Sequence, residues 1–501
     1  MRTLETDNVI IGSGLAGVLV ARELAAAGQR CTIVERGSLM TWDEQIRLGR
    51  WQEDSPTSEL NHENDPAGLD YPWTYVYGVG GSTNRWAGTS PRFLPEDFEV
   101  KSRYGIMRDW PLSYAELAPH YHSAERAMGV AGGDNALTPD TDYPLPPHPL
   151  GGQDRVVAPH LKPMVPLPQA RPTKAVGKRA ACCGSGRCQL CPVNARFSVL
   201  NALAEVFELP EVELMQKTVA AKLVSDGSGA RVVAVECLGE GGERLRIRAK
   251  RFVVAANGIE SAGLMQRSGI VTGDTGLNLF DHYNSKLLVR VDRDAGPGIG
   301  SSLVTAAIYS YYSGDFRRTR AGVLMLPFNP GAPIMVDRLV DGLADGRKGL
   351  SFRRDVATEW RQTLALDIYV DDRPNPRNRV TLSAKKDSLG LPLNHVRYEH
   401  PSDYWQRGVD HVIADVPRRL RALGAREARY FGAPQGAHLL GTLRMGTDDG
   451  AVVDRHQRHR RRENLFVSGG AVFPTYSPSH PTLTIGALSI RLGRYMASES
   501  V

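Results

Sequence analysis

Cysteine is scarce in this sequence, and most of it lies in one place. The chain has six cysteines in 501 residues, and four of them fall between Cys182 and Cys191. A secreted protein held together by disulfides spreads its cysteines more evenly along the chain. We therefore do not expect a disulfide framework, and we predict a cytoplasmic, reducing setting with a special role for the crowded thiols.

Long apolar runs are absent as well. No uninterrupted apolar stretch reaches the roughly 20 residues that a membrane-spanning helix needs. The first residues, MRTLETDNVIIG, lack the charged segment and the apolar segment that make up a signal peptide. We expect no transmembrane segment and no signal peptide, so export would require a partner subunit that carries this chain.

Excess charge of either sign is small. The formal net charge is +6, and the one conspicuous basic run, DRHQRHRRREN, is short and has apolar sequence on both sides. Domains that bind nucleic acids are usually far more basic. The run therefore predicts a solvated loop and no nucleic-acid partner.

Length and composition favour a large globular enzyme. A chain of 501 residues with 42% hydrophobic and 23% charged residues is too long for one ordinary core. It is better interpreted as two interleaved domains, or as one large domain with a substrate lobe. A chain of this size can bury a cofactor.

The first forty residues have the pattern of a dinucleotide-binding unit. In DNVIIGSGLAGVLVARELAAAGQRCTIVERG, a buried strand precedes a glycine-rich turn, a helix from Leu15 to about Ala27, and a second strand. The glycines of the turn, Gly12, Gly14 and Gly17, suit a tight bend, close backbone approach to a pyrophosphate, and packing of helix on strand. Exposed amides at the helix start would receive the phosphates.

An acidic residue ends the second strand of this unit. Glu35 can accept both ribose hydroxyls of a dinucleotide and would repel a 2'-phosphate, which disfavours NADP. The N-terminal position of the unit and the Arg36–Gly37 pair after Glu35 favour FAD over NAD. The motif alone does not distinguish these cofactors, and a glycine-rich turn without a ligand is the remaining alternative.

A second glycine-rich stretch carries a family resemblance. YGVGGSTNRWAGTSPRFLPEDF, followed by WPLSYAELAPHYHSAERAMGV, resembles the second signature of the glucose-methanol-choline (GMC) flavoprotein oxidoreductases. Its glycines allow the backbone to press against a flat ring, and short polar side chains follow them. In the same stretch, Ser113 and Glu116 predict a capping box that opens a helix.

Later stretches are similar to the same family, in the family's order. They include RFVVAANGIESAGLMQRSG, VELMQKTVAAKLV, RPNPRNRVTLSAKKDSLGLPLNHVRY and the C-terminal block that begins AHLLGTLRMG. The resemblance implies an α/β fold, α+β overall, with a doubly wound Rossmann-type FAD domain and a second domain with an antiparallel sheet. It assigns residues 1–110, 170–289 and 431–501 to the FAD domain, and 111–169 and 290–430 to the substrate-binding domain and cover loops.

The resemblance also implies FAD that is not covalently bound. In one branch of the family, a histidine at the position of Asn84 carries the flavin, and an amide cannot form that bond. The residues that the resemblance and the first motif place at the cofactor are Gly12, Gly14, Leu15, Ala16, Gly17, Glu35, Arg36, Gly78, Gly81, Ser82, Asn84, Val219, Ala256, Gly470, Pro481 and Thr482.

Two histidines match the active-site positions of the family. Oxidation of an alcohol through flavin needs a base for the hydroxyl proton, and histidine suits this task at neutral pH. We predict His438 as the base, with His480 holding the substrate oxygen or sharing the proton. The sugar-oxidising branch usually has asparagine at the second position, which weakens a direct transfer of its substrate. The other eleven histidines, His282 among them, are interpreted as structural or surface residues.

The crowded cysteines allow several interpretations. Zinc, an iron–sulfur cluster, disulfides and simple packing are all open to the spacing C-C-x4-C-x2-C. The segment is similar to that in catalytic subunits of bacterial FAD glucose and fructose dehydrogenases, where three cysteines hold a 3Fe-4S cluster. That resemblance implies Cys182, Cys183 and Cys188 as ligands, with Cys191 nearby.

The resemblance as a whole implies an FAD-dependent enzyme that oxidises a CH–OH group of a sugar-like molecule by histidine-assisted hydride transfer to flavin N5. The substrate class covers monosaccharides, glycosides, aminoglycosides and cyclitols. The electron acceptor would be oxygen, a quinone or dye, or a cytochrome subunit. The alternatives are an oxygen-using oxidase without a cluster, a non-redox lyase on the same fold, and a non-catalytic electron-transfer subunit.

Overall fold

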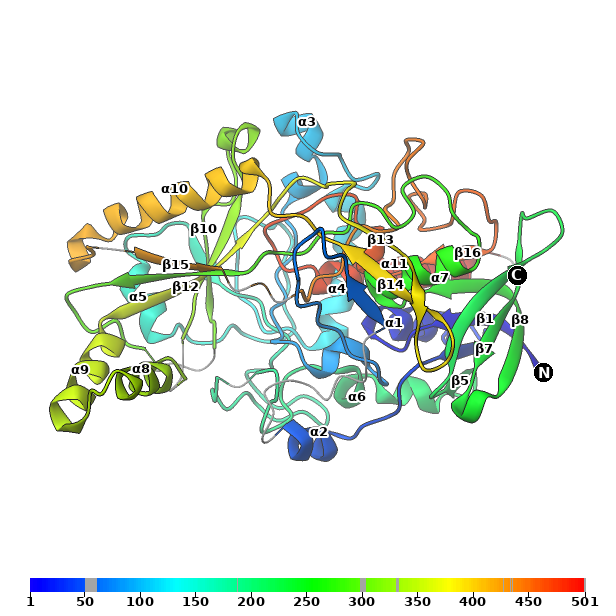
Figure 1. Cartoon of the computed structure of the whole chain (residues 1–501), viewed down its shortest axis with the longest axis horizontal. Helices are drawn as coiled ribbons and strands as arrows, with labels where there is room; N and C mark the ends of the chain where they lie inside the picture. Colours follow the sequence, from blue (N-terminus) through cyan, green and yellow to red (C-terminus); the bar gives the residue numbers. More distant parts are fainter. Residues whose placement is uncertain are drawn as a thin grey trace.

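The largest sheet of the molecule is built on the N-terminal unit (Figure 1). A computed structural model describes residues 1–49, 61–186, 188–297, 303–329, 333–426, 428–432, 434 and 436–499. Strand β1 (Arg2–Ile11) pairs in parallel with β2 (Cys31–Val34) and with β8 (Arg244–Val254). The strands of this sheet lie in the order β5-β2-β1-β8-β7-β6, and β16 also pairs with β8. The remaining members of the sheet are β5 (Val212–Met215), β6 (Val219–Ser225), β7 (Val232–Leu238) and β16 (Leu465–Val467).

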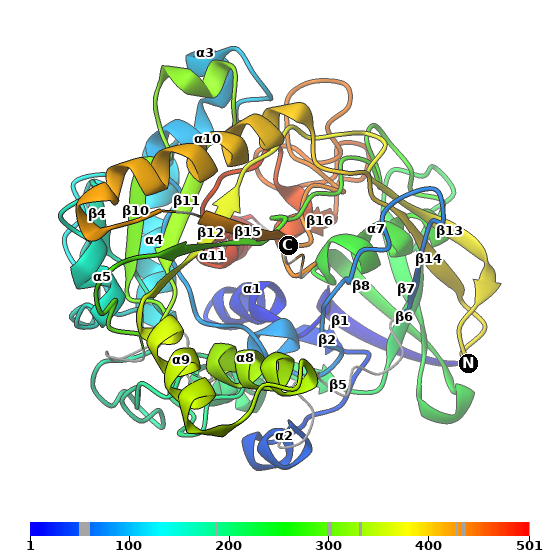
Figure 2. The same ribbon diagram turned by 60° about the vertical axis from the view of Figure 1, so that its left-hand side comes forward.

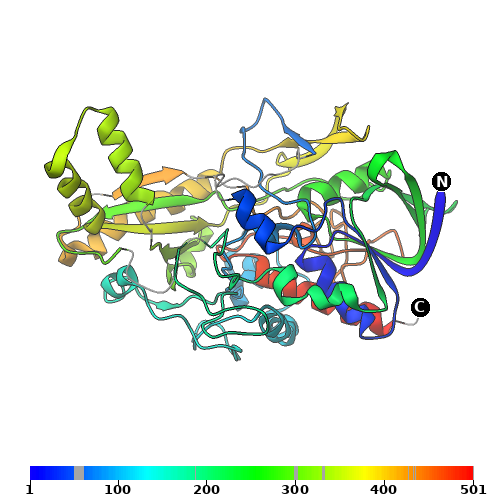
Figure 3. The ribbon, with the colours of Figure 1, turned by 90° about the horizontal axis from the view of Figure 1, so that it is seen from below.

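The predicted glycine turn lies between the end of β1 at Ile11 and the start of helix α1 (Leu15–Ala25). The helix ends two residues before the predicted position, and Gly28 turns the chain at φ +72° toward β2. Its buried face packs against α11 (Thr482–Ser498), which in turn contacts α4 (Tyr114–Met128). Figure 3 shows the red C-terminal helix beside the blue α1. The first and last segments of the chain therefore share one core.

The predicted capping box at the start of α4 is confirmed. The Ser113 side chain accepts a hydrogen bond from the backbone N–H of Glu116, and the Glu116 carboxylate accepts one from the Ser113 N–H. These two bonds satisfy amide groups that the first turn of a helix leaves free.

A second, six-stranded sheet is antiparallel throughout. Its order is β15 (Ala428–Gly432), β9 (Ser285–Arg290), β12 (Thr363–Val370), β11 (Val323–Pro327), β10 (Ala306–Tyr311) and β4 (Met164–Pro166). Leu366 and Ile368 belong to the same buried cluster as Val409 and Val412 of α10 (Asp403–Arg419). Figure 2 shows α10 lying across this sheet.

A three-stranded sheet joins two distant parts of the sequence. Strand β14 (Pro392–Arg397) pairs with β13 (Arg379–Lys386) and, in parallel, with β3 (His62–Asn64). Both β13 and β14 contact α7 (Asn257–Arg267), the helix that follows β8. The hairpin that the sequence assigns to the substrate domain therefore lies against the first domain's helix.

The remaining described elements are short helices and turns. They are α2 (Trp42–Gly49), α3 (Val100–Tyr104), α5 (Gly152–Val157), α6 (Val199–Ala202), α8 (Pro333–Ala344) and α9 (Gly349–Arg361), with 3₁₀ turns at Gly81–Asn84, Pro95–Phe98, Ala204–Glu208, Glu240–Gly242, Asp315–Arg318, Arg421–Leu423 and Gly470–Val472. No helix in these ranges has both the length and the apolar character needed to cross a bilayer. The predicted fold class, a mixed α/β domain with an added antiparallel-sheet domain, is confirmed.

Candidate active site

The three glycines of the first turn have different surroundings. A Cβ atom on Gly17 would lie 2.0 Å from the Gly12 carbonyl oxygen, and one on Gly12, at φ +106°, would lie 2.6 Å from the oxygen of Ala255. These two positions admit only glycine because the backbone is packed there. Gly14 precedes the first residue of α1, and a Cβ there would meet no atom within 4 Å. The turn therefore leaves open space at the helix N-terminus, where amides point outward.

Glu35 is buried and holds three loops together. Its Oε2 accepts hydrogen bonds from the Ser13 N–H (3.1 Å) and hydroxyl (2.7 Å), and its Oε1 accepts from the N–H groups of Gly37 (2.8 Å) and Gly78 (3.2 Å). A carboxylate has about four acceptor positions, so the protein alone fills them here. The contact with ribose hydroxyls stays a prediction; the structure assigns Glu35 the task of joining the first turn to the Gly78 loop.

The second glycine-rich stretch lies against the first. Gly80 and Gly81 have left-handed backbones, and a Cβ on Gly81 would lie 3.1 Å from the Cα of Gly14. In the following 3₁₀ turn the Asn84 side chain donates to the Val79 carbonyl (2.9 Å), while its buried Oδ1 has no partner in the part of the chain that the structure describes. The Ser82 hydroxyl accepts from the Val76 N–H (3.4 Å). Two glycine turns and one unsatisfied amide oxygen thus share a single region.

The other predicted cofactor residues surround this region or extend it. Ala16 lies 3.7 Å from the Cβ position of Gly469, next to Gly470, and Pro481 caps the start of α11 at Thr482. Ala256 follows Ala255, which packs on Gly12, and Leu15 is buried in α1. Val219 opens β6 directly after Thr218, whose N–H donates to the Glu35 carbonyl (2.8 Å).

Arg36 extends from the end of β2 toward the three-stranded sheet. It forms an ion pair with Asp387 (3.1 Å) and lies over the Tyr77 ring at 4.6 Å. Its Nη1 atom is buried and finds no hydrogen-bond partner within the described ranges. The arginine therefore links the end of β2 to the β13–β14 hairpin through Asp387, and its Nη1 group can still donate a hydrogen bond to a ligand.

His438 and His480, the two histidines that the resemblance implies, lie close together. Their ring centroids are 5.5 Å apart, although 42 residues of sequence separate them. The backbone N–H of His438 donates to the buried Asp281 carboxylate (2.7 Å), and the His480 ring lies 4.1 Å from the Tyr369 ring. The Nδ1 atom of His480 is buried and has no hydrogen-bond partner among the described residues.

Burial keeps both imidazoles neutral at pH 7. Burial, then the neighbouring His282 and His480, holds the pKa of His438 well below 6.5. The pKa of His480 is lowered to about 3 by burial and then by His282. A neutral imidazole carries one lone pair that can take a proton, which is the state that a general base requires.

A third histidine touches the pair, and the sequence interpretation missed it. His282 lies in the loop between α7 and β9, and its Nδ1 is 2.8 Å from the Nδ1 of His438. Its neighbour Asp281 has a pKa raised to about 7 by burial, which outweighs the bonds from Tyr71 and the His438 N–H. The stretch FDHYN places an acid beside a histidine, but nothing local indicates that it meets residue 438.

The face of the six-stranded sheet opposite α10 reaches this histidine group. Tyr369, on β12, contacts His480, and its ring lies 6.0 Å from that of His282. Asp367, two residues earlier on the same face, forms an ion pair with Lys286 of β9 (2.8 Å). Two residues along a strand span about 7 Å. The half-buried ion pair of Asp367 and Lys286 therefore lies about 7 Å along the strand from Tyr369, which contacts His480.

The cysteine segment does not form the predicted ligand set. In the described part of the chain, no three side chains of Cys, His, Asp or Glu gather as a metal site. Cys188 is buried and accepts a hydrogen bond from the Arg171 guanidinium, Cys191 accepts one from the Ala195 N–H (3.2 Å), and Cys183 is exposed. Among the described residues, Cys182, Cys183 and Cys188 are therefore not arranged as a ligand set, and the Cys188 sulfur has a buried arginine as its partner.

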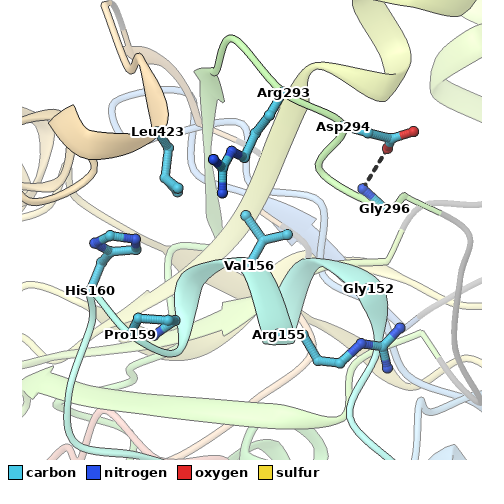
Figure 4. A pocket seen from close by; sticks show the side chains of 9 residues that line it. All are labelled: Gly152, Arg155, Val156, Pro159, His160, Arg293, Asp294, Gly296 and Leu423. Atoms are coloured by element: carbon cyan, nitrogen blue, oxygen red, sulfur yellow. Dashed lines mark hydrogen bonds between the residues drawn. The ribbon is translucent and has the colours of Figure 1, made fainter.

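An open cavity of about 400 Å³ lies elsewhere, beside helix α5 (Figure 4). It is lined by Gly152, Arg155, Val156, Pro159, His160, Arg293, Asp294, Gly296 and Leu423. None of the predicted site residues borders it. Its His160 therefore offers a histidine control outside the candidate site.

Comparison with known proteins identifies a family. Models described as GMC oxidoreductase match residues 168–284 and 374–489, and one described as FAD binding domain matches residues 7–43. The chain is 30% identical to 6'''-hydroxyparomomycin C oxidase of Streptomyces lividus over 98% of its length and 91% of the relative. It is 28% identical to fructose dehydrogenase large subunit of Gluconobacter japonicus over 98% and 97%.

A solved structure has the same fold. The crystal structure of pyridoxine 4-oxidase from Mesorbium loti covers 99% of this chain and 100% of its own, with a TM-score of 0.68 and 19% identity. This likeness concerns the arrangement of the chain and supports the fold class described above.

Proposed function

Because the chain belongs to the GMC oxidoreductase family, we propose that it is an FAD-dependent enzyme that oxidises a hydroxyl of a sugar-like substrate, with His438 as the base. The observation that carries this proposal is the meeting of two neutral imidazoles beside the face of the six-stranded sheet opposite α10, one of which has a buried ring nitrogen without a hydrogen-bond partner among the described residues. An anaerobic titration of the FAD-loaded protein with sugars and glycosides tests it.

The residues of the two glycine turns fit FAD. Gly14 faces open space at the start of α1, Gly81 packs on it, and the amide oxygen of Asn84 is buried without a partner. These groups and the Arg36 Nη1 would hold the cofactor through backbone amides and short polar groups. FAD supplies the hydride acceptor when bound. Asn84 supports non-covalent binding, because its amide cannot form a flavin bond.

The two histidines divide the work on the substrate hydroxyl. We assign proton removal to His438 and positioning of the same oxygen to His480, whose buried Nδ1 has no other partner. Two imidazoles this close titrate as a coupled pair, so their apparent pKa values belong to the pair and not to either ring. Their burial excludes water, which strengthens each hydrogen bond to the substrate.

Asp367 and Lys286 are proposed to hold the part of the substrate remote from the reacting carbon. A carboxylate accepts two hydroxyl hydrogen bonds at once, and the neighbouring Tyr369 and Phe328 rings give a flat surface against which a sugar can lie. Lys286 lies 3.8 Å above the Phe328 ring, so the pair and the ring form one surface. A simple alcohol would not reach it.

Asp367→Asn is expected to raise the KM for a sugar-like substrate about tenfold and to leave a short aliphatic alcohol unaffected, because a charged hydrogen bond contributes about 1.5–3 kcal/mol. Parallel kinetics with both substrates measure the difference. Asp315→Asn, at a side chain that is 96% exposed, is the matched control. An equal change for both substrates would show that Asp367 does not select the sugar.

For electron exit we propose the 3Fe-4S cluster on Cys182, Cys183 and Cys188 that the resemblance of the cysteine segment implies. Gly184 and Gly186, both left-handed, allow the loop to bend around a cluster. Arg171 and Arg196 are buried and form no ion pair with a carboxylate in the described chain, so negative charge is favoured there. In the described chain the thiols do not form a ligand set, so a cluster would require them to move together, while the Arg171 guanidinium could still donate to the Cys188 sulfur.

Iron analysis of the purified protein decides between acceptors. We expect about three irons per chain, lost in Cys188→Ser, with Cys237→Ser as the control because Cys237 is buried in β7 away from the segment. Iron-free protein that oxidises sugars would overturn the cluster and leave oxygen, a quinone or a dye as acceptor. The lyase alternative predicts turnover without loss of flavin absorbance, and the electron-transfer alternative predicts no turnover.

A further inference from the structure

We propose that His282 is a positioning residue that fixes the tautomer of His438 and so directs its basic nitrogen, Nε2, toward the substrate. The inference rests on the proposed role of His438. His282 is fully enclosed between the loop after Phe280 and the C-terminal block, and both of its ring nitrogens have defined partners.

The first partner determines where His282 carries its proton. The Nε2 atom of His282 lies 2.6 Å from the backbone carbonyl oxygen of Ser477. A carbonyl oxygen can only accept, so Nε2 must donate. Burial lowers the pKa of His282 to about 4, so the ring is neutral at pH 7 and has a single N–H. Its Nδ1 atom is therefore an acceptor.

The second partner then has only one possible state. The Nδ1 of His282 and the Nδ1 of His438 are 2.8 Å apart, and the first of them has no hydrogen. The hydrogen must lie on Nδ1 of His438, because two lone pairs facing each other at this distance would repel. His438 is also neutral, so its Nε2 keeps the lone pair. The structure thus selects one of the two tautomers of the base.

No other described group can replace His282 in this task. The Asp281 Oδ1 is 3.9 Å from the His438 Nδ1, which is too long for a hydrogen bond, and it already accepts from the His438 backbone N–H. His480 faces the ring at 5.5 Å between centroids and forms no hydrogen bond with it among the described contacts. Without His282, both tautomers of His438 would be populated.

A buried network holds the Ser477 carbonyl in place. The Ser477 hydroxyl donates to Asp97 (3.0 Å), which also accepts from the Tyr312 hydroxyl (2.6 Å) and from Arg317 (3.4 Å). All of these side chains are nearly or fully buried. This series of hydrogen bonds, from Arg317 through Asp97, Ser477 and His282 to His438, links the six-stranded sheet to the active-site loops. It therefore holds the His282 ring in a fixed orientation.

Two substitutions separate tautomer control from packing. His282→Leu fills the space but removes both hydrogen bonds, whereas the amide of His282→Gln retains an acceptor and a donor. We expect the leucine variant to slow substrate-dependent flavin reduction about 10- to 100-fold with little change in KM, and the glutamine variant to recover most of the rate. Circular dichroism and FAD content confirm that each variant is folded.

Nitrogen-15 NMR of histidine-labelled protein reads the tautomer without relying on activity. His438 signals are assigned by their loss in His438→Gln. We expect the Nδ1–H form alone in the native protein and in His282→Gln, and a mixture in His282→Leu. An Nε2–H form in the native protein, or a leucine variant with native signals and native rate, would overturn the proposal. If no substrate reduces the native flavin, the proposed function fails while the NMR result still stands.

Discussion

Replacing His438 by alanine is expected to leave FAD bound and to slow the loss of flavin absorbance on adding substrate by about 10²- to 10⁴-fold. This range is the usual contribution of a positioned general base. His438 is neutral, has one free nitrogen, and contacts neither of the glycine turns in the described hydrogen bonds, so its removal affects proton transfer and not cofactor binding. Anaerobic stopped-flow absorbance measures the rate.

The control for this variant is His160→Ala, in the cavity of Figure 4, which should reduce its flavin at the native rate. His480→Ala is expected to raise KM and lower kcat together, because it loses the group that orients the hydroxyl. Native reduction by the His438 variant would remove the assigned base. Loss of FAD in that variant would instead mean that His438 holds the cofactor site together.

Gly14→Ala is expected to weaken FAD binding at least tenfold, which is about 1.4 kcal/mol, while the fold without FAD keeps its stability. Gly14 has φ −70° and its Cβ would meet no protein atom within 4 Å, so alanine costs the fold nothing. The added methyl group would occupy the space that the cofactor backbone approaches. Titration with FAD, followed by fluorescence, gives the Kd.

Alanine substitutions at two other glycines serve as controls for Gly14→Ala. Gly227→Ala also adds a methyl group in open space, on a surface turn, and should leave both Kd and Tm unchanged. Gly17→Ala should lower Tm with or without FAD, since its Cβ would lie 2.0 Å from the Gly12 oxygen. Native affinity in Gly14→Ala would contradict a cofactor at this turn.

Local patterns predicted the parts of the fold that neighbouring residues decide. The turn at Gly12, the helix that starts at Leu15 and the cap at Ser113 depend on contacts within a few residues, and the structure has them. The meeting of His438 with His480 came instead from the family resemblance, because the sequence alone does not state that two loops converge.

The roles of Glu35, His282 and Asp367 depend on contacts between residues far apart in the sequence, so local patterns could not predict them. Glu35 obtains its donors from Ser13 and from Gly78, 43 residues away, so its structural task was hidden behind the ribose prediction. His282 lies 156 residues before His438, and nothing in FDHYN distinguishes it from a core histidine. The pairing of Asp367 with Lys286 depends on strand register, which the alternation of residues alone did not give.

The cysteines show the opposite case, in which a strong local signal is not matched by the structure. Four thiols within ten residues suggested a ligand set, but the Arg171 guanidinium, 17 residues before Cys188, occupies the buried sulfur. Spacing specifies which side chains can meet, whereas the surrounding charges decide which partner each one takes.

The central claim is that an alcohol held at His438 and His480 is oxidised at FAD seated against the two glycine turns. Its most direct test is the anaerobic visible spectrum of the FAD-loaded protein, titrated with a panel of sugars, glycosides, aminoglycosides and cyclitols. We predict stoichiometric loss of flavin absorbance with at least one of them and formation of the matching carbonyl product. A spectrum that stays oxidised across the whole panel, or product formed without any change in it, would contradict the account.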